Sequence, residues 1–335
     1  MKCLKKSLTF ITTLMLVTLS VGCNHNEIKD ITVAEVTHSI FYAPQYVALE
    51  KGFFGEEGLN VGLIGTQGAD KTMAALLSGE AQIGFMGPEA SIYVYNQGSK
   101  DYAINFAQVT KRDGSFLVSR TAEPDFKFEN LKGKEVIGGR KGGVPEMTLE
   151  YVLKNNGLLL GEDIASGTVN VRTDIQFAAM GGAFIGGEGN YVTLFEPIAT
   201  SLEKEGQGFI VASIGKESGE IPYTAYCALN SYMQKNPEVL QKFTNALYKG
   251  QQFVQNHSAE EIAPIIAPQF KEISNEDLIT IINRYKDIDA WCSEPTLTEE
   301  SVSRLMDVMQ LAGELDQRPE YNKIVNTEFA KNAIK

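Results

Sequence analysis

The order in which short apolar runs, glycine turns and helical patterns follow one another constrains this chain more than any other feature. Residues 59–64 are predicted to form a strand, and the turn at 65–70 leads into a helix that Gly79 ends. Residues 82–86 form the next predicted strand, and the turn at 87–89 opens another helix. Such repeated βα units predict a mostly parallel sheet flanked by helices, because parallel neighbours need a long crossover. The fold class is therefore predicted to be α/β.

Residues 37–54 pass from a strand through a turn into a helix that begins near Pro44. Ligands of open α/β sheets bind just beyond the carboxyl ends of the strands. Ser39, Phe41 and Tyr42 therefore occupy a place where a ligand is expected. For the two aromatic residues, ordinary packing in the core is an equally good explanation.

The βα pattern is interrupted once and then restarts. Residues 102–110 and 115–120 are predicted strands, and the Asp-Gly pair at 113–114 predicts a hairpin between them. New βα units begin at residue 136, and the chain after the alternating run at 222–229 is predicted to be helical. These patterns predict two α/β lobes with a cleft between them, and hinge closure of such a cleft is a common way to bind a small ligand.

The predicted division of the chain has four parts. They are a signal peptide at 1–22, a lipidated tether at 23–30, a first lobe at 31–119 and 227–335, and a second lobe at 120–226. The chain is expected to cross between the lobes near 118–122 and again near 222–228.

The N-terminus has the pattern of a secretion signal. Three lysines precede an apolar segment at 8–21 that is short and threonine-rich for a membrane span. The sequence LSVGC at 19–23 resembles a bacterial lipobox, although Ser20 stands where the usual pattern has leucine. Cys23 is therefore expected to carry lipid and to anchor an extracytoplasmic protein to the cell membrane.

Composition argues against several functional classes. The 335 residues are 43% hydrophobic and 21% charged, as in globular domains. Loss of the signal peptide removes three lysines and no acid, which changes the formal charge from -12 to -15 and argues against nucleic acid as a partner. The histidines and cysteines show no metal-ligand spacing, so neither a metal nor a cofactor is expected. The loop GGRKGG at 138–143 lacks the GK[ST] of a P-loop, and no protease or hydrolase motif is present, so an enzyme is not expected.

The loops after the other predicted strands supply further candidate ligand residues. Several of these loops open helices whose free N–H groups receive anionic or carbonyl oxygens, and Arg140 adds a cation. Glu89 and Glu196 would instead select amide, amine or ring N–H donors, unless they only serve the dipoles of their helices. Three tyrosines are candidates for stacking on a flat ring, with core packing as the alternative: Tyr42, Tyr191 and Tyr223.

Five segments together carry a family resemblance: Cys23 with its lipobox, FYAPQYVALEKGFF from 41, GEAQIGFMGP from 79, KGGVPEMTLEYVLKNNGL from 141 and GNYVTLFEP from 189. They resemble the substrate-binding proteins of ABC importers, within the group that serves nitrate, sulfonate, taurine and thiamine-pyrimidine uptake. The resemblance implies a two-lobed type II periplasmic-binding-protein fold with the ligand between the lobes. It also implies ligand contacts at Ser39, Phe41, Tyr42, Gly68, Ala69, Gly87, Pro88, Glu89, Arg140, Gly142, Gly143, Val144, Asn190, Tyr191 and Glu196.

The resemblance implies a monomeric receptor that delivers a small nutrient to an ABC permease and touches the membrane only through its lipid. Two ligand classes stay open. The Tyr and Glu residues favour a flat heteroaromatic compound such as a pyrimidine, whereas Arg140 and the helix N-termini favour a sulfonate, taurine or nitrate. Family members often carry an acid at the position of Asn190, so this departure indicates a less cationic ligand. The alternative from another class is a pyrimidine-synthesising enzyme of the same fold, for which the chain offers only His38 near a candidate loop and no cysteine-rich segment.

Overall fold

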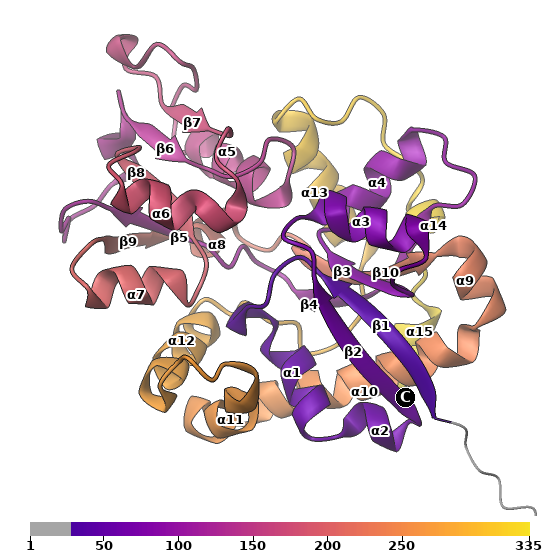
Figure 1. Cartoon of the computed structure of the whole chain (residues 1–335). Coiled ribbons are helices and arrows are strands. Elements are labelled where there is room, and N and C mark those ends of the chain that lie inside the picture. Colours follow the sequence, from indigo (N-terminus) through magenta and orange to yellow (C-terminus); the bar gives the residue numbers. More distant parts are fainter. Residues whose placement is uncertain (1–27) are drawn as a thin grey trace, which may run out of the picture.

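The computed structural model describes residues 28–335, which form two lobes, each built on a five-stranded sheet (Figure 1). Helices flank both sheets, so the predicted two-lobed α/β fold is confirmed. Both sheets are mixed, with parallel strands on one side and antiparallel strands on the other. The predicted signal peptide and Cys23 lie outside the described residues.

The first lobe holds the sheet β2-β1-β3-β10-β4, in which β1, β2 and β3 run parallel and β10 is antiparallel to both neighbours. Its strands are β1 (Lys29–Glu35), β2 (Leu59–Gly65), β3 (Ile83–Met86), β4 (Ala103–Thr110) and β10 (Thr224–Leu229). Every residue of β3 and β4 is buried, because helices cover both faces of the sheet. These helices are α1 (Ala43–Glu50), α2 (Phe53–Glu56), α3 (Ala69–Ser78), α4 (Glu89–Asn96), α9 (Asn230–Lys235), α10 (Pro237–Asn256), α11 (Ala259–Ile266), α12 (Asn275–Asp287), α13 (Glu299–Leu311), α14 (Tyr321–Ile324) and α15 (Glu328–Ala333).

The second lobe holds the sheet β7-β6-β8-β5-β9, in which β6, β7 and β8 run parallel. Its strands are β5 (Phe116–Ser119), β6 (Glu135–Ile137), β7 (Asn170–Arg172), β8 (Tyr191–Leu194) and β9 (Phe209–Ser213). Its helices are α5 (Val144–Asn155), α6 (Met180–Ile185), α7 (Ile198–Lys204) and α8 (Ile214–Ser218). Short 3-10 turns occur in both lobes, at Ile40–Tyr42, Phe128–Leu131, Ile164–Ser166, Phe177–Ala179 and Ala267–Gln269.

The chain crosses to the second lobe earlier than the sequence predicts. β5 pairs with β8 and β9, so the crossing lies at 111–115 rather than 118–122, and the boundary placed after residue 119 is too late by one strand. The predicted hairpin is also wrong, because β4 and β5 belong to different sheets. The buried Asp113 accepts a hydrogen bond from the Ser115 N–H at 2.6 Å, and this local turn redirects the chain without reversing it.

The return crossing lies at 219–223 and runs beside the first one. The predicted crossing at 222–228 and the boundary after residue 226 are too late, because β10 at 224–229 already belongs to the first sheet. The Ile221 N–H donates to the Lys111 carbonyl at 2.9 Å, and the Tyr223 N–H donates to the Thr110 carbonyl at 3.1 Å. Two short, hydrogen-bonded segments therefore join the lobes, as expected for a hinge.

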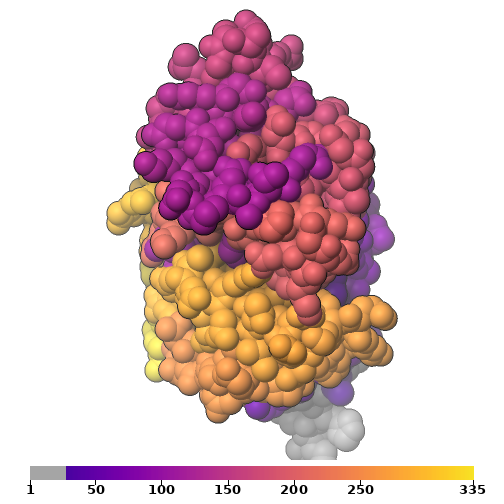
Figure 2. All heavy atoms as spheres, turned by 90° about the vertical axis from the view of Figure 1, so that its left-hand side faces the viewer, coloured from indigo at the N-terminus to yellow at the C-terminus, as the bar shows by residue number. Residues whose placement is uncertain are grey.

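The C-terminal helices belong to the first lobe but reach the second. In Figure 2 the orange segment that contains α11 and α12 lies directly beneath the second lobe. Across this boundary Lys204 of α7 forms an ion pair with Asp277 of α12 at 2.7 Å. On another side of the cleft α13 packs against α5. Within the described residues no helix is long and apolar enough to cross a membrane.

Candidate ligand-binding site

A cavity of about 250 Å³ lies between the two lobes. In the first lobe its walls come from the loops after β1, β2 and β3. In the second lobe they come from the loops after β6 and β7 and from the carboxyl end of β8. The parallel strands of both sheets therefore point their carboxyl ends at one cavity, which is the usual place for a ligand in this fold class.

Most of the predicted ligand residues line this cavity, because their loops follow those strands. They are Ser39, Phe41, Tyr42, Gly68, Ala69, Gly87, Glu89, Arg140, Gly143, Val144 and Tyr223. Their contact with a ligand stays a prediction, but the structure brings them together from five separate segments.

Pro88 and Gly142 lie beside the cavity without lining it. Pro88 is the residue that caps the N-terminus of α4. Gly142 is held against the first lobe, since its carbonyl accepts a hydrogen bond from Tyr93 Oη at 2.9 Å. Its own N–H donates to Glu146 Oε2 at 3.0 Å.

Asn190 and Tyr191 lie at the wrong end of a strand to reach the cavity. They precede and begin β8, whereas the cavity lies beyond the carboxyl end of that strand. Asn190 Oδ1 accepts a hydrogen bond from the Glu135 N–H at 2.9 Å, and Tyr191 Oη donates to Glu123 Oε1 at 2.8 Å. The expected stacking of a ligand on Tyr191 is therefore wrong.

Glu196 is buried at the boundary of the lobes rather than in the cavity wall. Its Oε1 lies 2.9 Å from Arg284 Nη1, and its Oε2 accepts a hydrogen bond from the Thr200 N–H at 2.9 Å. Both oxygens therefore have protein donors, and the residue does not line the cavity. The prediction that Glu196 contacts the ligand is therefore wrong, and its carboxylate instead binds Arg284 of the other lobe.

Two further segments line the cavity without having been predicted from the sequence, the loop after β7 and the residue after β8. Both follow parallel strands, so the rule that located Ser39 also applies to them. From these segments the cavity is lined by Thr173, Asp174, Ile175, Gln176, Phe177 and Phe195. Neither segment contains a glycine, which was the signal that marked the loops of Gly68, Gly87 and Arg140.

Glu89 is the buried charged group of the cavity wall. It is 2% exposed, and its Oε2 has no hydrogen-bond partner in the described part of the chain. Burial raises the pKa of this carboxyl from 4.5 to about 7, against the opposing effect of the Arg140 guanidinium. A methyl group on Gly87 would lie 2.0 Å from Glu89 Oε2, so the glycine leaves the space that the carboxyl occupies.

Aromatic rings form much of the wall around this carboxyl. The Phe41 ring lies 5.8 Å from that of Tyr42, 5.7 Å from that of Phe195 and 5.7 Å from that of Tyr223, centroid to centroid. Phe177 continues the cluster at 5.5 Å from Phe195. Rings from both lobes thus provide flat, apolar contact surface for a ligand of similar shape.

The charged groups at the cavity mouth come from opposite lobes. Arg140 of the second lobe and Asp70 at the start of α3 lie 3.7 Å apart, between Nε and Oδ1. Both side chains are exposed, so the pair is weak on its own and free to rearrange around a ligand.

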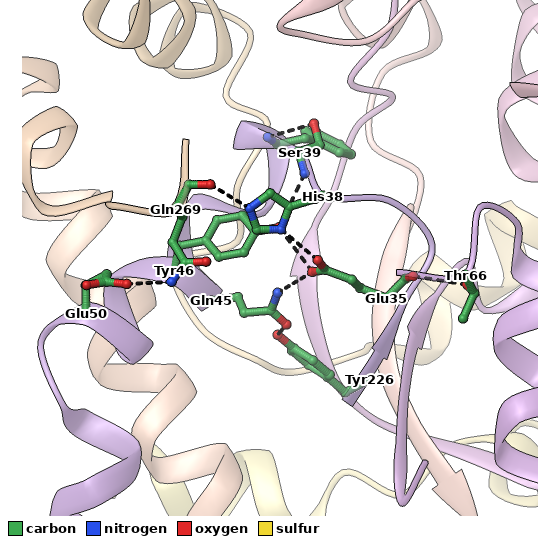
Figure 3. Close-up of polar contacts among 10 residues, drawn as sticks. Glu35, His38, Ser39, Gln45, Tyr46, Glu50, Thr66, Tyr226 and Gln269 are labelled. Carbon is green, nitrogen blue, oxygen red and sulfur yellow. Dashed lines mark hydrogen bonds and ion pairs between the residues drawn. The ribbon is translucent and has the colours of Figure 1, made fainter. Parts of the chain in front are cut away.

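Beneath the Ser39–Tyr42 turn lies a network of polar groups that is buried at Glu35, Gln45 and Tyr46 and reaches the surface at His38 (Figure 3). The Glu35 carboxylate accepts hydrogen bonds from Gln45 Nε2 at 2.7 Å and from Tyr46 Oη at 3.1 Å. His38 contacts Glu35 Oε1 through Nδ1 and the Gln269 carbonyl through Nε2, each at 2.9 Å. Because both partners accept, and the Glu35 hydrogen bond favours the imidazolium, the pKa of His38 is raised. The network ties the ligand loop to α1 and to the C-terminal helical segment.

No three side chains of His, Cys, Asp or Glu among residues 28–335 are placed to hold a metal ion. Cys227 and Cys292 are free and buried. Burial raises the pKa of the Cys227 thiol to about 12, which makes it a poor nucleophile, and it packs in a hydrophobic cluster of the first lobe.

Comparison with known proteins places the chain in a family. A family model described as "NMT1/THI5 like" matches residues 40–261. The chain belongs to the NMT1/THI5-like family. A relative from Bacillus subtilis (strain 168), named "Putative binding protein YtlA", is 47% identical to this NMT1/THI5-like chain over 311 residues, which are 92% of each protein.

Solved structures with a similar fold include two binding proteins. The alkanesulfonate-binding protein SsuA from Xanthomonas axonopodis pv. citri, bound to MOPS, is 14% identical, with a TM-score of 0.69 over 90% of this chain and 99% of that one. The periplasmic nitrate-binding protein NrtA from Synechocystis PCC 6803 is 17% identical, with a TM-score of 0.69 over 92% of this chain and 88% of that one. At these identities the likeness concerns the fold, and it agrees with the periplasmic-binding-protein architecture implied by the sequence.

Proposed function

We propose that this protein is the extracytoplasmic substrate-binding component of an ABC importer and that it binds a small heteroaromatic compound carrying N–H donors. The family, a close relative named as a binding protein and the fold of SsuA and NrtA support the general role. In this role the protein binds its ligand between the lobes, delivers it unchanged to permease subunits and acts as a monomer. Lipidation of Cys23 would keep it at the membrane, and Cys23→Ala should then release it from the membrane fraction of cells.

The observation that carries the ligand class is the unpartnered oxygen of Glu89 in an aromatic cavity. A buried carboxyl without a partner is costly, and a ligand N–H that reaches it removes that cost. Above its pKa of about 7 the carboxyl is ionised, so an anion such as nitrate or a sulfonate would meet a like charge there, and burial makes this repulsion stronger than it would be in water. A flat ring with an amino group satisfies both the carboxyl and the aromatic wall.

An anionic ligand is the second candidate, because Arg140 lines the cavity mouth beside the N-termini of α3 and α5. Helix N-termini and a guanidinium are a good site for a sulfonate. Against it, the Arg140 side chain is exposed and faces Asp70, whereas Glu89 is buried and has an unoccupied oxygen.

A thermal-shift screen of residues 24–335 distinguishes the two candidates. The compounds are aminopyrimidines, flavins, taurine, alkanesulfonates and nitrate. At 100 times its dissociation constant a ligand adds about 2.7 kcal/mol to the free energy of unfolding, which raises the melting temperature measurably. We expect an aminopyrimidine to act and Glu89→Gln to weaken its effect, with Asp174→Asn as the control for another acid of the cavity wall.

The opposite result would be a shift with sulfonates or nitrate that Arg140→Ala removes and Glu89→Gln leaves intact. That pattern would replace the heteroaromatic ligand by an anion. Conversion of any bound compound into a new product, followed by chromatography, would contradict the binding role itself.

A further inference from the structure

Glu196 of the second lobe is held by three residues of the first lobe. Its carboxylate lies 2.9 Å from Arg284 Nη1, its carbonyl accepts a hydrogen bond from Ser39 Oγ at 2.9 Å, and its N–H donates to Tyr285 Oη at 3.2 Å. The main chain and the side chain of Glu196 are thus both bound to the other lobe. The Glu196 side chain is fully buried and that of Arg284 is 25% exposed, so water competes little for these contacts.

Arg284 reaches out of its own lobe. Each of the three hydrogen bonds that its guanidinium donates goes to the second lobe, to Glu196, Thr200 and Glu203. If the lobes part, Arg284 loses all three partners, whereas Glu196 keeps its hydrogen bonds from the Thr200 N–H and Oγ1 within α7. The interaction therefore favours the closed arrangement without leaving a buried carboxylate unpaired in an open one.

Ser39 links this contact to the ligand loop. Its hydroxyl donates to the Glu196 carbonyl and also accepts a hydrogen bond from the Phe41 N–H at 3.3 Å, as the cap of the 3-10 turn at Ile40–Tyr42. Phe41 and Tyr42 of this turn line the cavity, while Arg284 and Glu196 do not. The contact between Glu196 and Ser39 thus positions the turn that forms a wall of the cavity, although Glu196 itself does not line the cavity.

We propose that Arg284 and Glu196 form a latch that holds the lobes closed and so sets ligand affinity without touching the ligand. Other interlobe ion pairs are less suited to this task. Lys204–Asp277 joins α7 to α12, but the Lys204 side chain is more than half exposed, and exposed pairs contribute little. The part of the proposal that concerns affinity rests on the proposed binding function, whereas the closed arrangement can be measured without ligand.

The first test is the distance between the lobes in ligand-free protein. Spin labels on Leu77→Cys in the first lobe and Leu159→Cys in the second report this distance, since both positions are exposed and the native Cys227 and Cys292 are buried. We expect Arg284→Met to lower the ratio of closed to open molecules roughly tenfold or more, as for loss of a buried charged partner. Arg284→Lys should restore part of the closed population, and the matched control Lys204→Met should leave it unchanged.

The second test is the dissociation rate of an aminopyrimidine, if the screen above confirms its binding. Arg284→Met should raise this rate on the order of tenfold with little change in association rate, because a latch acts after the ligand has entered. Unchanged interlobe distances in Arg284→Met would overturn the latch, whatever the ligand proves to be. Altered distances without any aminopyrimidine binding would overturn the ligand class and leave the latch standing.

Discussion

The buried carboxyl of Glu89 should make the stability of this protein fall as the pH rises from acid to neutral. In the folded protein burial raises its pKa to about 7, while in the unfolded chain the value stays near 4.5. Below pH 4.5 the carboxyl is protonated in both states and has no effect. Between pH 4.5 and 7 the unfolded chain loses the proton while the folded protein keeps it, so the free energy of unfolding decreases.

The size of this effect follows from the two pKa values. A pKa difference costs 1.36 kcal/mol for each unit, so the interval from 4.5 to about 7 lowers the free energy of unfolding by about 3 kcal/mol. This decrease is complete above pH 7. Glu89→Gln keeps the shape of the side chain and removes the titration. The stability of the variant relative to the unchanged protein should therefore rise by about 3 kcal/mol between pH 4.5 and pH 8.

Urea unfolding at a series of pH values, followed by the fluorescence of the single tryptophan Trp291, measures this difference. Comparison at each pH cancels the titration of other buried acids such as Asp113 and Glu146, whose pKa values are also raised by burial. Asp70→Asn is the control, because it removes an exposed acid from the first turn of a neighbouring helix. If the curves for Glu89→Gln and the unchanged protein stay parallel from pH 4.5 to 8, the argument from burial is refuted.

Two further predictions concern the support of the ligand loop. A methyl group on Gly250 of α10 would lie 2.3 Å from the Pro44 carbonyl of α1, so Gly250→Ala should cost about 1–3 kcal/mol of stability by forcing the helices apart, and an unchanged urea midpoint would contradict this packing. The raised pKa of His38 means that its contribution to stability is fully present below pH 6.5 and is lost as the pH rises through the raised value. His38→Gln should therefore be least stable, relative to the unchanged protein, at acid pH, and a deficit that grows toward alkaline pH would show that the imidazolium is not the stabilising form.

The sequence was informative for the loops that follow the parallel strands β1, β2, β3 and β6. Glycine turns and helix starts located Ser39, Gly68, Gly87 and Arg140, because the same local signals that end a strand also place the next residues at the ligand edge of the sheet. The two-lobed fold followed from the restart of the βα pattern. These inferences depend on short-range chemistry that the sequence displays directly.

The predictions from the sequence are wrong where tertiary contacts determine the position of a residue. Tyr191 stands next to glycines and looks like a loop residue, but the direction of β8 puts it at the far edge of the sheet. Glu196 follows that strand as the rule requires, yet Arg284, 88 residues later in the chain, occupies its carboxylate. The Asp-Gly pair at 113–114 is typical of a hairpin turn, but β4 and β5 belong to different sheets and form no hairpin. No local pattern reports such long-range partners.

The most direct test of the account is isothermal titration of residues 24–335 with an aminopyrimidine, beside the Glu89→Gln and Asp174→Asn variants. Loss of a hydrogen bond between a ligand N–H and a charged or buried carboxyl costs about 1.5–3 kcal/mol, which corresponds to roughly a 10- to 150-fold weaker dissociation constant. We expect this weakening in Glu89→Gln and near-normal binding in Asp174→Asn. Equal affinities in all three proteins, or binding of sulfonates and nitrate alone, would contradict the recognition of an N–H donor by Glu89.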